Sequence, residues 1–243
     1  MKKVDVTKIL YWFVLVSFIV PIVYLILKMA FFMNENDTKT RADYALMLVQ
    51  CILGIIVINL PSLLAKKLKF DIPPALYIMY ILFLYGAIFL GEVRSFYYNV
   101  PHWDDVLHFC SSMMTGMFGF MLVAILNQNK RIAVNLSPVF ICIFAFSFSV
   151  MIGSVWEIYE YTFDGILGLN MQKFRFEDGT NLVGHAALRD TMKDIIVDCC
   201  GALLASVLGF ISIKNRKGWT YEYISEEQKD KQKDEQQNES TEN

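Results

Sequence analysis

Six apolar stretches, each about as long as a bilayer is thick, alternate with short polar segments along the chain. A hydrocarbon core of about 30 Å needs roughly 20 apolar residues of α-helix to cross it. The pattern predicts spans at residues 9–32, 44–64, 74–90, 103–126, 138–161 and 190–213. Prolines interrupt or begin four of these spans, at Pro21, Pro61, Pro73-Pro74 and Pro138. The sequence therefore predicts an all-α polytopic membrane protein with six transmembrane helices.

The polar segments indicate one membrane domain followed by a tail. The first apolar run is too long for a signal peptide, and no small-x-small cleavage site follows it. The longest loop, residues 162–189, joins the fifth and sixth spans. Residues 219–243 are rich in Glu, Gln, Lys, Asp and Asn, a composition typical of disorder. We expect a transmembrane domain over residues 1–218 and a largely disordered cytoplasmic tail over residues 219–243.

The distribution of basic residues predicts the orientation. Six spans place both termini on one side, and Lys and Arg are enriched in cytoplasmic loops. The side with the termini carries eleven: Lys2, Lys3, Lys8, Lys66, Lys67, Lys69, Lys130, Arg131, Lys214, Arg216 and Lys217. The opposite side carries six: Lys39, Arg41, Arg94, Lys173, Arg175 and Arg189. The chain is thus predicted to be multi-pass in the cell membrane, with both termini cytoplasmic.

The overall composition supports a membrane protein and argues against a nucleic-acid-binding protein. The sequence is 55% hydrophobic with a mean hydropathy of +0.40, which is high for a soluble globular protein. The net charge of −2 argues against a nucleic-acid partner, so membrane lipids are the expected surroundings. All five cysteines fall inside apolar segments, which favours small buried hydrophobes over a disulfide framework.

Ionisable residues interrupt the last three spans, and they are the candidate chemistry. A charged side chain near the bilayer centre costs roughly 2.5–3.5 kcal/mol, so such residues tend to mark function or a buried partner. The fourth span opens with Asp104, Asp105 and His108, the fifth closes with Glu157 and Glu160, and the sixth carries Asp190, Asp194 and Asp198. Spacings of three or four residues place each set on one helix face, and all three sets fall at the outer ends of their helices. We expect them to converge on one outward-facing site.

Simpler interpretations remain for some of these residues. Asp104, Asp105 and Asp190 are equally suited to capping helix N-termini. The two glutamates of the fifth span oppose the helix dipole, and the two deeper aspartates of the sixth are too far inside to be caps. His108 alone suits a satisfied buried histidine, but seven neighbouring carboxylates favour a site. Trp156 is interpreted as an anchor at the membrane interface.

So many carboxylates need compensation, and the cations nearest in sequence are only Arg94, Arg189 and Lys193. A divalent metal is one solution: mixed carboxylate and imidazole ligands suit Zn, Mn or Fe, with Asp104, His108, Glu160 and Asp194 as the ligands. Metal-activated water would then act on a lipid or cell-envelope precursor, with Asp104, His108, Glu157, Glu160, Asp190 and Asp194 as the candidate catalytic residues. Protonation of the acids is the other solution, because burial and like charge favour a neutral carboxyl, and it predicts a proton- or cation-coupled transporter. A third class is a structural or partner-binding membrane protein.

Three motifs carry a resemblance to known families: Asp104-x-x-x-His108-Phe109, Glu157-x-x-Glu160-Tyr161, and Asp190-Thr191-x-x-Asp194 followed by Gly201-Ala202-Leu203-Leu204. Residues 75–213 resemble the YjdF-like family of bacterial inner-membrane proteins. They are more distantly similar to the VanZ-like family, named for a teicoplanin-resistance protein. Asp105 stands where these families usually have Lys or Arg, and Asp198 stands at the VanZ-like Asn position. The resemblance implies an envelope or glycopeptide context and no particular reaction.

Overall fold

The computed structural model describes residues 6–34, 41–68, 72–127, 136–176 and 179–218. Six helical segments in this part of the chain are long and apolar enough to cross a membrane: Val6–Phe31, Asp43–Lys67, Pro74–Val93, Trp103–Val123, Pro138–Leu167 and Arg189–Lys214. No strand forms among the described residues, where Arg175 and Asn181 make an isolated β-bridge. The all-α membrane fold expected from the sequence is confirmed. The predicted tail at 219–243 lies outside the described residues. So do some of the basic residues used to predict the orientation, namely Lys2, Lys3, Lys39, Lys69, Lys130 and Arg131.

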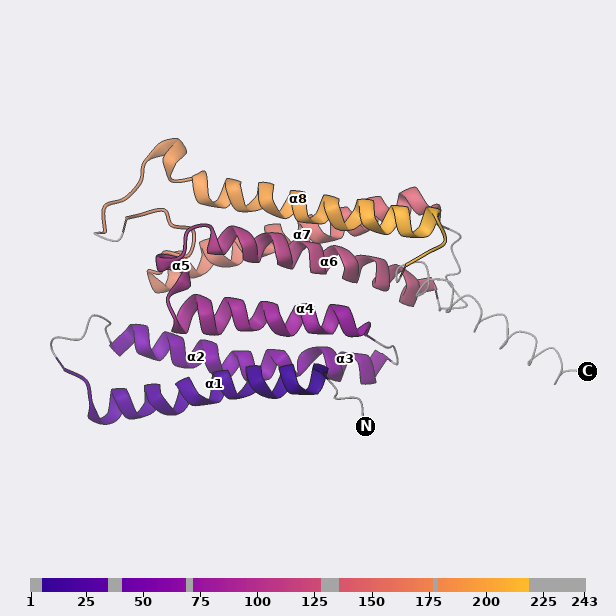
Figure 1. Ribbon diagram of the computed structural model, residues 1–243. Helices are drawn as coiled ribbons and strands as arrows, with labels where there is room; N and C mark the ends of the chain where they lie inside the picture. The colour runs from indigo at the N-terminus through magenta and orange to yellow at the C-terminus, as the bar shows by residue number, and fades with distance from the viewer. Residues whose placement is uncertain (1–5, 35–40, 69–71, 128–135, 177–178, 219–243) are drawn as a thin grey trace, which may run out of the picture. The chain divides into compact units, whose positions relative to one another are not determined.

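The chain divides into two compact units, residues 1–107 and 108–243. The division falls inside α6 (Trp103–Asn127), so this helix belongs to both units. The first unit contains α1 (Val6–Phe31), α2 (Arg41–Ile58), α3 (Leu60–Leu68), α4 (Pro74–Leu84), the π-helix η1 (Tyr85–Val93) and the short α5 (Phe96–Asn99), as Figure 1 shows. Its core joins α1, α2 and α4 through the buried side chains Val14, Phe18, Ile58, Ile81 and Leu84.

The second span of this unit is interrupted next to Pro61, where α2 ends and α3 begins. Pro61 has no backbone N–H, so the carbonyl of Val57, four residues earlier, loses its helical donor. The hydroxyl of Tyr80 on α4 donates to that carbonyl at 2.6 Å instead. The Asn59 side chain donates to the carbonyl of Ile55 at 2.8 Å. The helix therefore ends as α2 and restarts as α3 with the carbonyls of Val57 and Ile55 both hydrogen-bonded.

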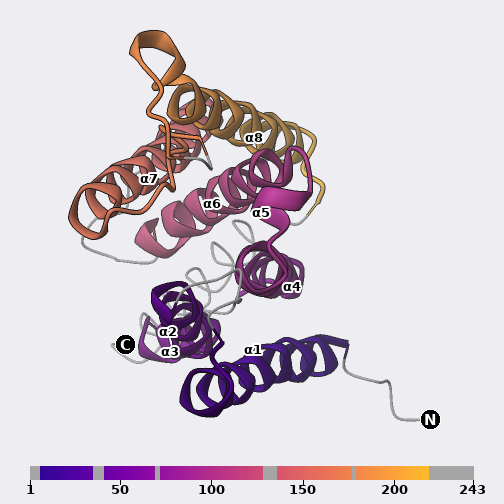
Figure 2. The same cartoon turned by 90° about the vertical axis from the view of Figure 1, so that its left-hand side faces the viewer.

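The second unit contains α6 from His108 onward, α7 (Pro138–Leu167), the 3₁₀ turn η2 (Gly184–Ala186) and α8 (Arg189–Lys214), and α7 and α8 lie side by side (Figures 1 and 2). Glycines let the backbones approach closely, as is common between membrane helices. Gly201 of α8 packs against the carbonyl of Phe109 and the side chain of Ser112 on α6. Gly119 of α6 lies against Ala145 of α7. This packing brings polar side chains from three helices to one depth.

Helix α7 extends to Leu167, beyond the end expected near residue 161. Gly168 ends it in the left-handed region, with φ of 67°. The Asp164 carboxylate then accepts hydrogen bonds from the backbone amides of Met171 (2.7 Å) and Gln172 (3.0 Å). The glutamates of α7 thus lie turns before the C-terminus, where the opposing helix dipole acts only weakly because its effect is confined to the last turn.

Candidate functional site

The imidazole of His108 lies between carboxylates from the two other helices of the second unit. Its Nδ1 is 3.4 Å from Oδ2 of Asp198 on α8. Its Nε2 is 4.0 Å from Oε1 of Glu157 on α7. All three side chains are buried, with exposed fractions of 7%, 2% and 5%. A residue from each of α6, α7 and α8 therefore meets at one point.

Several oxygens of this cluster are buried without a hydrogen-bond partner in the described part of the chain. They are both carboxylate oxygens of Glu157 and Oδ1 of Asp198. Thr191 and Gln172 lie close enough to Glu157 to act on its charge, but neither meets the geometry of a hydrogen bond. Burying an ionised carboxylate without a partner is very costly, so the group takes up a proton or a cation. The cluster is therefore chemically suited to bind a positive charge.

Asp104 and Asp194 lie beside the same histidine. One ligand atom each from Asp104, His108 and Asp194 lie within 4.8 Å of one another, in an arrangement able to hold a metal ion. Asp104 is one turn before His108 on the continuous helix α6, so the helix itself sets their relation. Asp194 is 1% exposed and lies one turn before Asp198 on α8. Of the four metal ligands expected from the sequence, three are thus grouped.

The fourth expected ligand, Glu160, is not in that group among the described residues. It is buried, and its Oε1 accepts a hydrogen bond from Nε1 of Trp156 at 2.9 Å. Trp156 combines this bond with the exposed position expected of an interface anchor, since its side chain is 45% exposed. The two residues stand four apart, so the bond runs along one face of α7.

The remaining acids at the helix ends have other contacts. Asp190 forms an ion pair with Lys173 at 3.3 Å. Its helix α8 has Leu188 at the N-cap, so Asp190 lies in the first turn rather than at the cap. Asp105 contacts the exposed His102, with 2.7 Å between Oδ2 and Nδ1. Asp105 therefore has a local partner outside the cluster.

Sequence reasoning missed part of this arrangement. The sequence indicates that Asp198 lies deep within the sixth span, but it does not predict that this aspartate contacts His108. The spacing offered a signal, because Asp190, Asp194 and Asp198 repeat every four residues. What no periodicity shows is the space that Asp198 occupies: its carboxylate fills the position where Gly153 on α7 lacks a side chain. The loop residues Gln172 and Lys173 were also missed, because their contacts depend on how the loop folds back.

Hydroxyl groups continue from the cluster along the helix interfaces. Thr115 on α6 and Ser149 on α7 place their oxygens 2.9 Å apart. Ser149 also donates to the carbonyl of Ser112 at 2.6 Å. On α8 the buried Ser206 hydroxyl has no hydrogen-bond partner in the described residues. The second unit therefore contains a polar seam that extends beyond its acids.

Comparison with known proteins places the chain in a family. Residues 3–215 match the family described as "Predicted membrane protein (DUF2238)". The chain belongs to this family. It is also 29% identical over 143 residues to a Thermotoga maritima protein described as "Uncharacterized protein", a match that covers 57% of this chain and 65% of that relative. No solved structure matches it. Neither description names a reaction.

Proposed function

We propose that the cluster on α6, α7 and α8 binds a divalent cation and uses it for chemistry on a lipid or cell-envelope precursor. The observation that carries this proposal is the buried His108 between Asp198 and Glu157. Both carboxylate oxygens of Glu157 and Oδ1 of Asp198 have no hydrogen-bond partner among the described residues. A bound cation would neutralise these carboxylates and occupy their lone pairs at once. A set of imidazole and carboxylate ligands favours Zn, Mn or Fe over Mg and Ca.

The distances support a metal site. Ligand atoms lie about 2.0–2.2 Å from zinc, so two ligands of one ion are at most about 4.4 Å apart. The separation of 4.0 Å between Nε2 of His108 and Oε1 of Glu157 is within that limit. The ligand atoms of Asp104, His108 and Asp194 all lie within 4.8 Å of one another, close to that limit.

The two nitrogens of His108 suit different tasks. A metal-ligating histidine usually donates its other ring N–H to a carboxylate or carbonyl, which fixes the ring and its tautomer. Asp198, the deepest acid and the one at the shorter distance, suits this orienting role at Nδ1. Nε2, beside Glu157, then carries the lone pair for the ion. Asp198 is thus a positioning residue, and Glu157 is a candidate ligand.

A bound ion at this position would supply an activated water molecule. The substrate class is inferred from location and resemblance. The cluster lies at the end of the second unit where the α7–α8 loop folds back, and Gln172 of that loop donates to Thr191 at 2.8 Å. The resemblance of residues 75–213 to the YjdF-like and VanZ-like families supports an envelope context. An envelope precursor carried by a lipid would reach this end within the plane of the membrane.

Metal content of the purified full-length protein tests the proposal. After supplementation with Zn or Mn, we expect about one ion per chain in the parent and in His102→Ala, a control whose side chain is 74% exposed. His108→Ala and Glu157→Gln should lose the ion and melt at lower temperature. An ion at 100 times its Kd stabilises a fold by about 2.7 kcal/mol, and that contribution disappears with the ligands.

A metal-free protein that is stable in chelator and indifferent to added Zn or Mn would overturn this function and favour the second candidate, proton- or cation-coupled transport. The specific observation behind transport is the set of acids and hydroxyls along the helix interfaces of the second unit. Asp190 and Asp198 are eight residues apart, about 12 Å along α8. Beyond them come the hydroxyls of Thr115 and Ser149. In that case Asp198→Asn should abolish ion flux in reconstituted vesicles, and Glu157→Gln should leave stability unchanged or raise it, because the amide mimics a neutral acid.

A further inference from the structure

The turn that leads into α8 carries a second inference, independent of the acid cluster. Residues 183–188, here called the apolar turn, have the sequence Val-Gly-His-Ala-Ala-Leu, and His185 has the only polar side chain among them. They comprise η2 and the residues that flank it, and five of the six are exposed. Val183 is 84% exposed and Leu188 is 61% exposed. The described part of the chain therefore leaves these two large apolar side chains uncovered.

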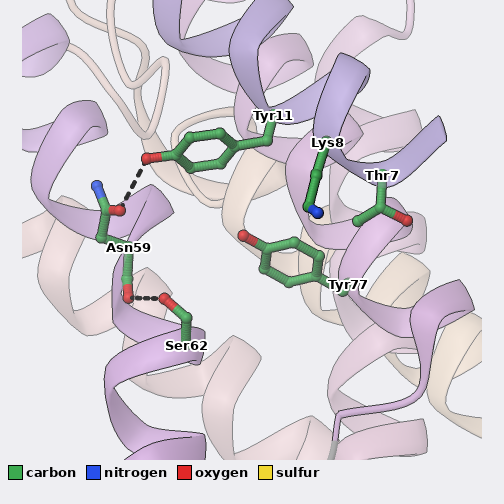
Figure 3. A pocket seen from close by; sticks show the side chains of 6 residues that line it. All are labelled: Thr7, Lys8, Tyr11, Asn59, Ser62 and Tyr77. Carbon is green, nitrogen blue, oxygen red and sulfur yellow. Dashed lines mark hydrogen bonds between the residues drawn. The ribbon is translucent and has the colours of Figure 1, made fainter. Parts of the chain in front are cut away.

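A polar lining is the alternative at a helix end, and the first unit has one. Near the start of α1, a recess of about 300 Å³ is lined by polar side chains that include Tyr11 and Asn59 (Figure 3). The Tyr11 hydroxyl donates there to Oδ1 of Asn59 at 2.9 Å. Side chains of this kind are compatible with water. Those of the apolar turn are not, because apolar surface is unfavourable in water.

The exposed face of α8 continues into the apolar turn. The backbone N–H of Met192 donates to the carbonyl of Leu188 at 3.1 Å, so Leu188 lies one helical turn before Met192. Met192 and Ile196 follow at intervals of four residues and are 50% and 59% exposed. The three side chains thus share one face. Because Ile196 belongs to a helix long and apolar enough to cross the membrane, lipid covers this face, and Leu188 extends it toward the loop.

The length of α8 places its first turn among the lipid headgroups. Its 26 residues, at 1.5 Å each, span about 39 Å, which is about 9 Å more than the hydrocarbon core. Lys214 in the last turn marks the opposite end. The excess length is divided between the two ends, and the headgroup region on each side is about 5–8 Å deep. The apolar turn, which directly precedes α8, therefore lies at the level of the headgroups.

The direction of the chain before α8 brings the apolar turn over the surrounding lipid. In Figures 1 and 2, the orange segment that precedes α8 bends sideways, away from α6 and α7. It therefore projects over the space beside α8. In a membrane that space is filled by lipid, and exposed apolar side chains at headgroup level insert into the boundary between headgroups and acyl chains.

We propose that the apolar turn binds the membrane surface at the α7–α8 loop, with Val183 and Leu188 inserted between the lipid headgroups. A lipid surface is favoured over a protein partner because the exposed apolar side chains are continuous with the lipid-covered face of α8. Arg189 follows the turn and is exposed, and its guanidinium suits the phosphate of a headgroup. The membrane thus holds the α7–α8 loop from its lipid side.

The test places the photo-crosslinking residue p-benzoylphenylalanine at position 183 of the full-length protein, reconstituted into nanodiscs of phosphatidylglycerol and phosphatidylcholine. After illumination, intact-mass spectrometry measures the fraction of chains that carry the mass of one lipid. Position 180 is the matched control, because Thr180 is an exposed polar residue of the same loop. Both variants carry the same hydrophobic probe, so a difference between them reports the position. We expect severalfold more lipid adduct from position 183 than from position 180.

A second measurement uses ordinary side chains. Hydrogen exchange of the amides of residues 183–188, measured by mass spectrometry in the same nanodiscs, should be severalfold faster in Val183→Glu than in the parent, because a carboxylate opposes insertion. Val183→Leu keeps an apolar side chain and should exchange like the parent. Equal lipid adducts at positions 183 and 180, or unchanged exchange in Val183→Glu, would overturn the proposal. An adduct with the mass of two chains at position 183 would also overturn it and replace the lipid with a second copy.

Discussion

The missing side chain of Gly153 is what allows Asp198 to reach its position. A Cβ built on this glycine of α7 meets the Asp198 carboxylate and its Cβ, so the two helices cannot keep their distance with any larger residue there. Asp198 in turn places Oδ2 3.4 Å from Nδ1 of His108. One small residue on one helix thus sets the orientation of a histidine on another, through an acid on the third.

We therefore predict that Gly153→Ala destabilises the protein by about 1–3 kcal/mol, the usual cost of overpacking a tight interior. It should also lower metal occupancy, because Asp198 can no longer hold the ring of His108. Gly165→Ala on the same helix is the control, since no atom lies within 4 Å of its Cβ position. In a helix this control should be neutral or stabilising by up to about 1 kcal/mol. Thermal unfolding and metal analysis of both variants measure the effect, and equal stability of the two would contradict it.

At this scale the sequence could predict which residues carry the chemistry but not how they pair. Acids and a histidine in apolar helices are visible from residue type alone, and spacings of four give their shared faces. The distances of Asp198 and Glu157 from His108 depend on helix separation, which glycines such as Gly201 set from the opposite side of the interface. The hydrogen bond from Trp156 to Glu160 could not be predicted from the sequence either. The position of Trp156 at the membrane interface does not reveal that its Nε1 donates to a buried carboxylate.

At the scale of elements, the α2–α3 junction shows how a helix tolerates a proline. The hydroxyl of Tyr80 on α4 donates the hydrogen bond that the backbone of Pro61 cannot. We predict that Tyr80→Phe costs about 1 kcal/mol of stability, since the Val57 carbonyl loses its partner. In a Pro61→Ala background the restored N–H can bond to that carbonyl, so the additional cost of Tyr80→Phe should vanish. Tyr24→Phe is the control, at a position on α1 that is 59% exposed. A double-mutant cycle in detergent measures this coupling, and additive effects would show that the two groups act separately.

Element ends were the least predictable feature of the helices. The sequence placed the end of the fifth span near residue 161, yet α7 continues to Leu167. The apolar pattern fades there, but helical hydrogen bonds continue until Gly168 adopts a positive φ. The wide turns of η1 were also not anticipated. Apolar composition predicts that a segment crosses the membrane, whereas its last turns depend on local contacts such as Asp164 with the loop.

At the scale of the whole molecule, exposed apolar surface indicates which solvent the chain needs. In the most apolar window of α1 only 22% of the residues are buried within the protein, so lipid must cover the rest. The sequence predicted this class correctly because six long apolar runs admit no other arrangement. It also predicted an orientation, which follows from the basic residues rather than from the packing.

That orientation can be measured with reporters. We predict that a cytoplasm-active reporter fused after Arg216 is active, and that a reporter inserted at Gly179 is active on the outer side. Gly179 suits insertion, because it lies in a turn with φ of 85° and no atom lies within 4 Å of its Cβ position. Fusions carrying the opposite reporter at each site serve as controls. The reverse pattern would place the acid cluster on the cytoplasmic side.

The attachment of the α7–α8 loop has a kinetic consequence for whatever enters the second unit from that end. Three hydrogen bonds hold residues 171 and 172: two to the Asp164 carboxylate and one from Gln172 to Thr191. The ion pair of Lys173 with Asp190 adds little, because the lysine is 39% exposed. At about 1 kcal/mol per bond, release costs about 3 kcal/mol. Because each 1.4 kcal/mol changes an equilibrium constant tenfold, the loop is released in roughly one molecule in a hundred. Exchange of an ion beneath the loop would therefore be about a hundredfold slower than at a site that is always open.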